Sequence, residues 1–144
     1  MKRGFEALKK DIILPQRATS YSAGYDFFCP EQTVFAPYEK KQVATYVKAY
    51  MQKEEHLQLH IRSSLALKRH LRLVNGVGII DSDYYNNEDN EGHIFIALEN
   101  CSDQTIIIEK GERFVQGIFL PYLVTDTDDV SRQRNGGLGS TGKK

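Results

Sequence analysis

The sequence predicts an all-β domain, and three observations support this prediction. A chain of 144 residues with 40% hydrophobic and 26% charged residues suits one globular domain with its own core. Short segments alternate apolar and polar residues, as in Leu57–Ile61, which is the period of a half-buried strand. Turn residues such as Ala36-Pro37 and Lys110-Gly111 separate these segments. Many short strands punctuated in this way predict a sandwich, a jelly roll or a barrel.

Strand-like segments and one helix follow one another along the chain. The expected strands are Asp11–Leu14, Tyr25–Phe28, Gln42–Tyr50, Leu57–Ile61, Leu73–Val77, Ile94–Glu99, Thr105–Ile108 and Phe114–Leu123. Ser63 or Ser64 is expected to cap a short helix that runs through Leu65–Arg69. The start of this helix, with Arg62 just before it, is either an anion site or an ordinary capped surface helix.

The segment Val74–Tyr84 carries the chemistry that stands out most. It places Asp81, Asp83 and Tyr84 at the end of an apolar run that glycines interrupt. On a strand, Asp81 and Asp83 would share one face, where two carboxylates could activate water or hold a metal ion. The alternative is the end of a hairpin capped by acidic turn residues.

The last part of the chain changes character. Residues 125–129 are acidic and polar, and residues 136–142 contain four glycines in seven positions. Such a segment loses too much entropy to pack as a strand or a helix. It is either a disordered tail or an arm that becomes ordered over a phosphate. It is not a Walker A loop, because the order of residues differs and no helix can follow.

Charge and cysteine content exclude several classes of protein. The formal net charge is zero, so no global field draws the chain to nucleic acid or to an anionic membrane. The chain has no apolar run of transmembrane length, and its charged N-terminus does not resemble a signal peptide. Cys29 and Cys101 fit buried, reduced thiols better than a disulfide. These features predict a cytoplasmic protein.

Five segments, in this order, resemble the five motifs of the trimeric dUTPase family. They are Ala23–Asp26, Arg62–Ser64, Gly78–Tyr84, Gly111–Gln116 and Arg134–Gly142. Each motif is weak alone, but all five in order cover nearly the whole chain and are specific. The long stretch after Tyr84 resembles the variants of Gram-positive bacteria and their phages.

The resemblance implies a jelly-roll-like β-barrel with one short helix, spanning residues 1–130, and a flexible glycine-rich arm at residues 131–144 that closes over the site. It implies a homotrimer with shared active sites. The implied reaction is hydrolysis of dUTP to dUMP and pyrophosphate with Mg²⁺, which would limit uracil in DNA and supply dUMP for thymidylate synthesis.

The resemblance also assigns roles to individual residues. Asp81 is implied as the catalytic base and Gln116 as a partner of the α-phosphate or the attacking water, while Asp26 would position Mg²⁺ through water. Arg113 is expected to form a structural ion pair, and Asp83 to support the turn. The implied substrate-binding residues are Arg62, Ser63, Ser64, Asn75, Gly78, Ile79, Ile80, Tyr84, Phe95, Arg134, Leu138, Gly139, Ser140 and Thr141.

Two positions depart from the family pattern. Leu138 stands where an aromatic residue usually stacks on uracil, and a base–aromatic stack is worth about 1–3 kcal/mol. We therefore expect weaker closure of the arm. Asn86 stands where the family commonly has a glycine, so we expect a longer hairpin tip and altered contacts to the ribose.

Two other functions compete with this interpretation. A dCTP deaminase shares the fold and uses a glutamate on the strand after the third motif, where Glu99 lies. Alternatively, the polar stretch Tyr85–Glu91 could bind a regulatory protein of a phage or its host; a tolerated surface loop is the simpler explanation. The basic cluster at residues 68–72 is expected to be a solvated face.

Overall fold

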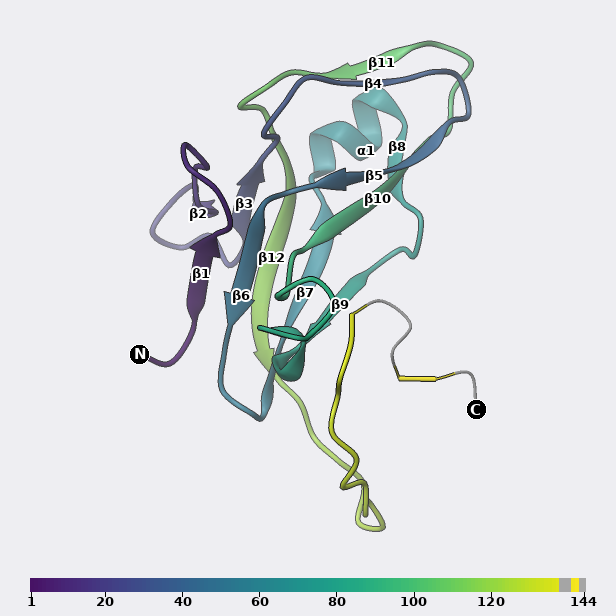
Figure 1. The fold of residues 1–144 in the computed structure, drawn as a ribbon. Coiled ribbons are helices and arrows are strands. Elements are labelled where there is room, and N and C mark those ends of the chain that lie inside the picture. The colour runs from purple at the N-terminus through teal and green to yellow at the C-terminus, as the bar shows by residue number, and fades with distance from the viewer. Residues whose placement is uncertain (138–140, 143–144) are drawn as a thin grey trace.

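The computed structural model describes residues 1–137 and 141–142. Antiparallel strands dominate it, with one α-helix and one 3-10 helix (Figure 1). The strands are β1 Gly4–Ala7, β2 Gln16–Arg17, β3 Tyr25–Phe28, β4 Thr33–Phe35, β5 Lys40–Ala44, β6 Val47–Tyr50, β7 Glu55–Ile61, β8 Leu71–Leu73, β9 Gly78–Asp81, β10 Phe95–Asn100, β11 Ile106–Ile108 and β12 Arg113–Pro121. The helices are α1 Ser63–Arg69 and η1 Ser82–Tyr84.

The strands form two main sheets and two strand pairs. The larger sheet has the order β2-β3-β12-β7-β9 and the smaller one β5-β10-β8, while β1 pairs with β6 and β4 with β11. Alternate residues point into a common core, for example Leu57 and Leu59 from β7 and Ile96 and Leu98 from β10. The jelly-roll-like all-β fold is therefore confirmed.

Several predicted strands are confirmed, with small shifts at their ends. Tyr25–Phe28 is β3. The predicted segments at 57–61, 94–99, 105–108 and 114–123 correspond to β7, β10, β11 and β12. The period of two was a sufficient signal here, because each of these strands buries one face against the core.

The predicted strand Gln42–Tyr50 is two strands instead of one. β5 ends at Ala44 and β6 begins at Val47, and Tyr46 between them has a φ of 58°. The buried hydroxyl of Thr45 donates to the carbonyl of Ile94 at 2.7 Å and accepts the N–H of Val47 at 3.2 Å. These bonds hold the chain in a bend that a period of two cannot reveal.

Two other strand predictions were wrong. Residues 73–77 form the end of β8 and a turn, because Gly76 adopts a φ of +73° and the next strand starts only at Gly78. Asp11–Leu14 lies outside the sheets; Asp11 has a φ of 63°, and Ile13 and Leu14 are exposed.

The helix prediction is correct in position but wrong in its cap. Ser63 and Ser64 lie inside the first turn of α1, and Arg62 is the N-cap, without a hydrogen bond from its side chain to the helix. The N–H groups of Leu65 and Ala66 bond to the carbonyl of Arg62 instead. Both serines are exposed, so their hydroxyl groups face solvent at the start of the helix.

After β12 the chain runs below the sheets and returns toward the end of β9 (Figure 1). This places the last described residues beside residues that precede them by about fifty positions in the sequence. Within residues 1–137 and 141–142, no helix is long and apolar enough to cross a membrane.

Candidate active site

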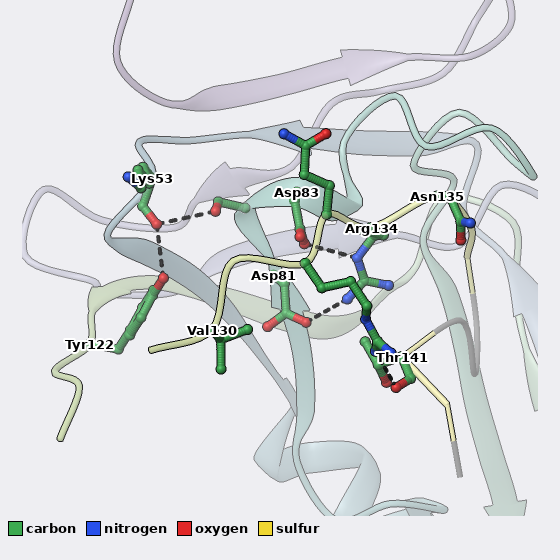
Figure 2. A pocket seen from close by; sticks show the side chains of 11 residues that line it. Lys53, Asp81, Asp83, Tyr122, Val130, Arg134, Asn135 and Thr141 are labelled. Carbon is green, nitrogen blue, oxygen red and sulfur yellow. Dashed lines mark hydrogen bonds and ion pairs between the residues drawn. The ribbon is translucent and has the colours of Figure 1, made fainter. Parts of the chain in front are cut away.

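A cleft of about 960 Å³ opens between the end of β9 and the returning C-terminal segment (Figure 2). Its floor comes from Asp81 and from η1, and its roof comes from the segment that includes Arg134. The lining residues are Lys53, Asp81, Ser82, Asp83, Tyr122, Val130, Arg132, Gln133, Arg134, Asn135 and Thr141.

Asp81 is the last residue of β9 and the N-cap of η1. β9 lies at the edge of the larger sheet and pairs only with β7, where Asp81 stands opposite His56. The side chain of Asp81 is 53% exposed, so water and substrate can reach its carboxylate. Asp83 belongs to the 3-10 turn, so of the two alternatives the structure shows acidic residues in a turn after the strand, not two carboxylates on one strand face. The turn nevertheless directs both toward the cleft (Figure 2).

Arg134 joins the two carboxylates. Its Nη2 donates to Oδ2 of Asp81 at 2.7 Å, and its Nε donates to Oδ1 of Asp83 at 2.8 Å. The side chain of Arg134 is only 9% exposed, whereas those of Asp81 and Asp83 are 53% and 59% exposed. The fork of the guanidinium thus binds both acids, with a separate N–H group for each carboxylate.

Tyr84 packs beneath this ion-pair cluster. Its side chain is buried, and its ring centroid lies 5.8 Å from the guanidinium carbon of Arg134. The hydroxyl donates to the carbonyl of His93 at 2.6 Å and accepts from Nδ2 of Asn90 at 2.9 Å. Burial raises the pKa of Tyr84, so the phenol stays neutral and the ring acts as a fixed wall.

A second cluster of predicted site residues lies on β3 and β12 and before α1. Nη1 of Arg113 donates to Oδ2 of Asp26 at 3.0 Å, and Nε of Arg62 lies 3.7 Å from Oδ1. The ion pair expected of Arg113 is present. Gln116 stands opposite Asp26, and its side chain lies against Gly24, so a larger residue at position 24 would require the amide of Gln116 to move.

The two clusters are separated within one chain. Asp81 pairs with His56 on one side of β7, and Gln116 pairs with His60 on the other side. His56 and His60 are four residues apart on β7, which is about 13 Å along the strand. In addition, β7 lies between β9 and β12, so these two strands are separated by two strand spacings of about 4.8 Å each. One chain therefore does not bring Asp81 and Gln116 into one site.

Comparisons with known proteins agree with these motifs. The family model for dUTPase matches residues 10–142. A deoxyuridine 5′-triphosphate nucleotidohydrolase of Lactococcus lactis is 51% identical, with 97% of each chain covered. This chain belongs to the dUTPase family.

Further relatives support the same assignment. A deoxyuridine 5′-triphosphate nucleotidohydrolase of Hydrogenobaculum is 37% identical over the full length of both chains. The crystal structure of the dUTPase from Streptococcus mutans is 48% identical and superposes with a TM-score of 0.80, covering 85% of this chain and 98% of that one. A dUTPase from phage phi11 of S. aureus has a TM-score of 0.76, with 92% of this chain and 97% of that one covered, but at 22% identity it shows the fold alone. As a dUTPase, the chain is a dUTP diphosphatase and hydrolyses dUTP.

The base-binding residues expected of a dUTPase lie on β9, in the turn before it and at the start of β10. Asn75 is in the exposed turn, and Ile79 is 52% exposed on β9. Gly78 lies against the side chain of Leu59, where an added Cβ would come within 3.1 Å. Phe95 belongs to the smaller sheet and stacks on His93 with ring centroids 4.2 Å apart.

The arm is only partly described. Arg134 and Thr141 line the cleft, and the carbonyl of Thr141 accepts a hydrogen bond from Nη2 of Arg132 at 2.7 Å. The predictions for Leu138, Gly139 and Ser140 lie outside the described residues.

Sequence reasoning missed Lys53 and Tyr122. Both line the cleft, and the carbonyl of Lys53 accepts hydrogen bonds from Tyr122 at 3.0 Å and from Ser82 at 3.2 Å (Figure 2). Lys53 lies in the turn between β6 and β7, where no motif marks it. Tyr122 directly follows β12 and was predicted only as a strand residue.

The residues around Asp26 do not form a complete metal site. The carboxylate already faces Arg113 and Arg62, and two guanidinium groups disfavour direct binding of a cation there. Among the described residues, no group of three or more His, Cys, Asp or Glu side chains could hold a metal ion. Asp26 thus fits only the water-mediated contact that the sequence predicts, with the phosphates of the substrate as the main ligands.

The cysteines agree only in part with expectation. Cys29 is buried, and burial raises the pKa of its thiol. Cys101 is exposed, contrary to the prediction that both are buried. Both are free, so the disulfide that the sequence disfavoured does not form.

Folding stability should depend on pH through His93. Its Nε2 accepts the N–H of Tyr46 at 2.9 Å, and burial lowers its pKa below the usual value of 6.5. The unfolded chain therefore binds a proton more readily than the folded chain. This contribution to stability is complete above pH 6.5 and is lost as the pH falls through the folded pKa.

We expect the urea midpoint of the protein to fall more steeply below pH 6.5 than that of His93→Gln. Glutamine keeps an acceptor but cannot titrate. Parallel curves for the two proteins between pH 7.5 and pH 5 would show that His93 does not carry this dependence.

Proposed function

We propose that this dUTPase cleaves dUTP by attack of an Asp81-activated water on the α-phosphorus. The oxygen of the water bonds to phosphorus, its proton passes to the Asp81 carboxylate, and the bridging oxygen leaves with pyrophosphate. The observation that carries this proposal is the exposed carboxylate of Asp81 at the floor of the cleft. The products are dUMP, a precursor for thymidylate, and pyrophosphate, so the reaction keeps dUTP low.

The two arginine-containing clusters suit the triphosphate. We assign Arg62, Ser63 and Ser64 to one part of it, because the serines are exposed at the start of α1 beside Arg62. We assign Arg134, Ser140 and Thr141 to the β- and γ-phosphates on closure of the arm. Supporting this, the Arg134 fork already binds a pair of acidic groups.

Gln116 and Asp26 would complete the site. Gln116 is proposed to hydrogen-bond near the α-phosphate or the attacking water, and Asp26 to contact waters of Mg²⁺. When bound with the triphosphate, Mg²⁺ would neutralise phosphate charge and hold the phosphates in one geometry. A mutant of the dUTPase from phage phi11 of S. aureus coordinates a structural Mg(II) ion.

The nucleoside is proposed to lie along β9. Asn75 and the backbone of Gly78, Ile79 and Ile80 would read uracil together with Phe95, while Leu138 would cover the base. Backbone readout discriminates well, because a wrong base leaves buried donors unpaired. Tyr84 would support the sugar; its ring is already fixed by two hydrogen bonds.

We infer a homotrimer in which each site combines the Asp81 cluster of one chain with the Asp26 cluster of another. The separation of the clusters across β7 supports this inference. We further infer that residues 1–130 form the barrel and 131–144 the arm, since β12 ends at Pro121 and Arg134 crosses back to Asp81. The two free cysteines fit a cytoplasmic location.

The competing functions receive less support. Glu99, the residue a dCTP deaminase would use, is held by Nε of Arg72 at 2.7 Å and lies 4.0 Å from Lys40. Its carboxylate is thus engaged in ion pairs. The stretch Tyr85–Glu91, considered for a regulatory partner, contacts the arm of its own chain, because Asp89 accepts a hydrogen bond from the N–H of Gly137.

Pyrophosphate release with Mg²⁺ across dUTP, dTTP, dCTP and UTP tests the proposal. We expect turnover of dUTP to exceed that of each other nucleotide by at least about a hundredfold, as buried unpaired polar groups can enforce. UTP differs from dUTP by a 2′-hydroxyl on the sugar that Tyr84 is proposed to support, so equal turnover of UTP would contradict the role of Tyr84 in excluding ribose. Ammonia release from dCTP would indicate a deaminase instead.

A further inference from the structure

The loop Asn86–Gly92 is a folded structure rather than a loose tip. The side chain of Asn87 is 8% exposed; its Nδ2 donates to the carbonyl of Tyr84 at 2.8 Å, and its Oδ1 accepts the N–H of Asp89 at 3.0 Å. Oδ1 of Asn90 accepts from Asn87 at 2.7 Å and from the N–H of Gly92 at 3.0 Å. These bonds hold the shape of the loop, because each asparagine joins two or more points of it.

This loop contacts the arm at Gly137. Oδ2 of Asp89 accepts the N–H of Gly137 at 2.8 Å, and Gly137 is buried. A Cβ added at Gly137 would lie 2.8 Å from Nδ2 of Asn90, closer than such atoms approach. The loop therefore bonds to the arm at Gly137, and a larger residue there would require the side chain of Asn90 or the arm itself to move.

The contact between the loop and Gly137 is linked to the cleft through Asn90 of the loop and through Arg134 of the arm. Asn90, which packs against Gly137, donates to the hydroxyl of Tyr84 at 2.9 Å. The carbonyls of Gly136 and Gly137 accept from Nη1 of Arg134 at 3.4 and 3.3 Å. One turn of the arm thus binds Asp89 through an N–H group and Arg134 through carbonyl groups.

We propose that the loop Asn86–Gly92 is the seat of the arm and that Asp89 is a positioning residue for dUTP hydrolysis. Asp89 acts through the arm: by holding Gly137 it keeps this turn of the arm next to the cleft and so lowers the entropic cost of bringing Arg134 to the triphosphate. This inference deepens the proposed function and rests on it. It also gives the stretch after Tyr84 a role within the chain.

Asp89→Ala tests this role, with Glu88→Ala as the matched control. Glu88 carries the same charge one position earlier and is exposed. We expect Asp89→Ala to raise KM for dUTP about three- to tenfold, the loss expected for one hydrogen bond at an exposed position, with kcat changed less than KM. Asp89→Asn keeps an oxygen acceptor and should restore most of the loss, and Glu88→Ala should behave like the unmodified protein.

A second readout does not need turnover. Trypsin can cleave after Arg132, which is exposed, and after Arg134, whose side chain is 9% exposed. Without nucleotide, Asp89→Ala should speed cleavage after Arg134 about three- to tenfold relative to cleavage after Arg132, as mass spectrometry would show. Gly137→Ala should do the same, because its methyl group displaces the arm from Asn90.

The outcomes separate the two proposals. Unchanged KM and unchanged cleavage in both Asp89→Ala and Gly137→Ala would overturn the role of the loop. The same change in Glu88→Ala would also overturn it, since only charge would then matter. If the unmodified protein releases no pyrophosphate from dUTP while Asp89→Ala still speeds cleavage, the proposed function fails and the seat of the arm stands.

Discussion

Asp81→Asn is expected to lower kcat for dUTP hydrolysis by about 10²–10⁴-fold, the usual contribution of a general base. Asparagine has nearly the same shape but cannot take the proton of the attacking water. The substitution lies at the exposed end of an edge strand, so the fold and dUTP binding should be largely retained. Pyrophosphate release under single-turnover conditions, with dUTP binding measured by calorimetry, checks both parts.

Asp83→Asn is the matched control for this prediction. Asp83 makes the same kind of bond to Arg134 and is exposed to the same degree, so its substitution removes an equal charge from the cleft. We expect Asp83→Asn to lower kcat by less than about tenfold, because it loses an arm contact without losing the base. Near-normal turnover of Asp81→Asn, or an equal loss in the two variants, would refute the assignment of Asp81.

Removal of residues 134–144 is expected to lower kcat/KM for dUTP by about 10²–10³-fold. That is the loss typical of removing a preorganised donor from a developing charge. The truncation takes away Arg134 and the turn that seats on Asp89. Because the last strand ends at Pro121, the thermal midpoint should change little. Pyrophosphate release and thermal unfolding by circular dichroism measure the two effects.

Two single substitutions test which arginine of the arm accounts for the effect of the truncation. Arg134→Ala should reproduce most of the loss, because this arginine alone bridges the arm to both carboxylates. Arg132→Ala removes the same charge from an exposed position that bonds within the arm, and it should cost much less. Full activity of the truncated chain would show that the arm is not a lid.

The two predictions have a common structural origin. Arg134 donates to the carboxylate of Asp81, the proposed base. In the proposed mechanism Arg134 exchanges Asp81 for phosphate, so binding of dUTP and release of the base are coupled through one side chain. Asp83 and Asp89 keep the arm close during this exchange.

Much of the fold was predictable where a strand buries one face. In β3, β7 and β10 the alternation of apolar residues is local, and the core simply reinforces it. The breaks at Thr45 and Gly76 were not predicted, because a hydrogen bond from the Thr45 hydroxyl to a distant carbonyl or a left-handed φ decides them. Strand β1, which is only four residues long, was missed because it has little apolar pattern and depends on pairing with β6.

For the site, too, one part was predictable from the sequence and another part was not. The order of its motifs could be recognised in the sequence, and the roles of Asp26, Asp81 and Arg134 were predicted from their places in these motifs. Their partners were not readable: Arg134 with Asp81, Lys53 with Tyr122 and Asp89 with Gly137 meet across about 50 to 70 positions.

The sequence by itself thus determined the family and the all-β class and supplied the residues proposed to carry the chemistry, since composition, periodicity and motif order are local properties. Only the tertiary structure decided that the carboxylates hold the arm, that Asp81 and Gln116 lie apart within one chain, and that the loop after Tyr84 seats the arm. These facts depend on strand register and loop closure, which arise from burial and hydrogen bonding between distant segments and leave no mark in any short stretch of sequence.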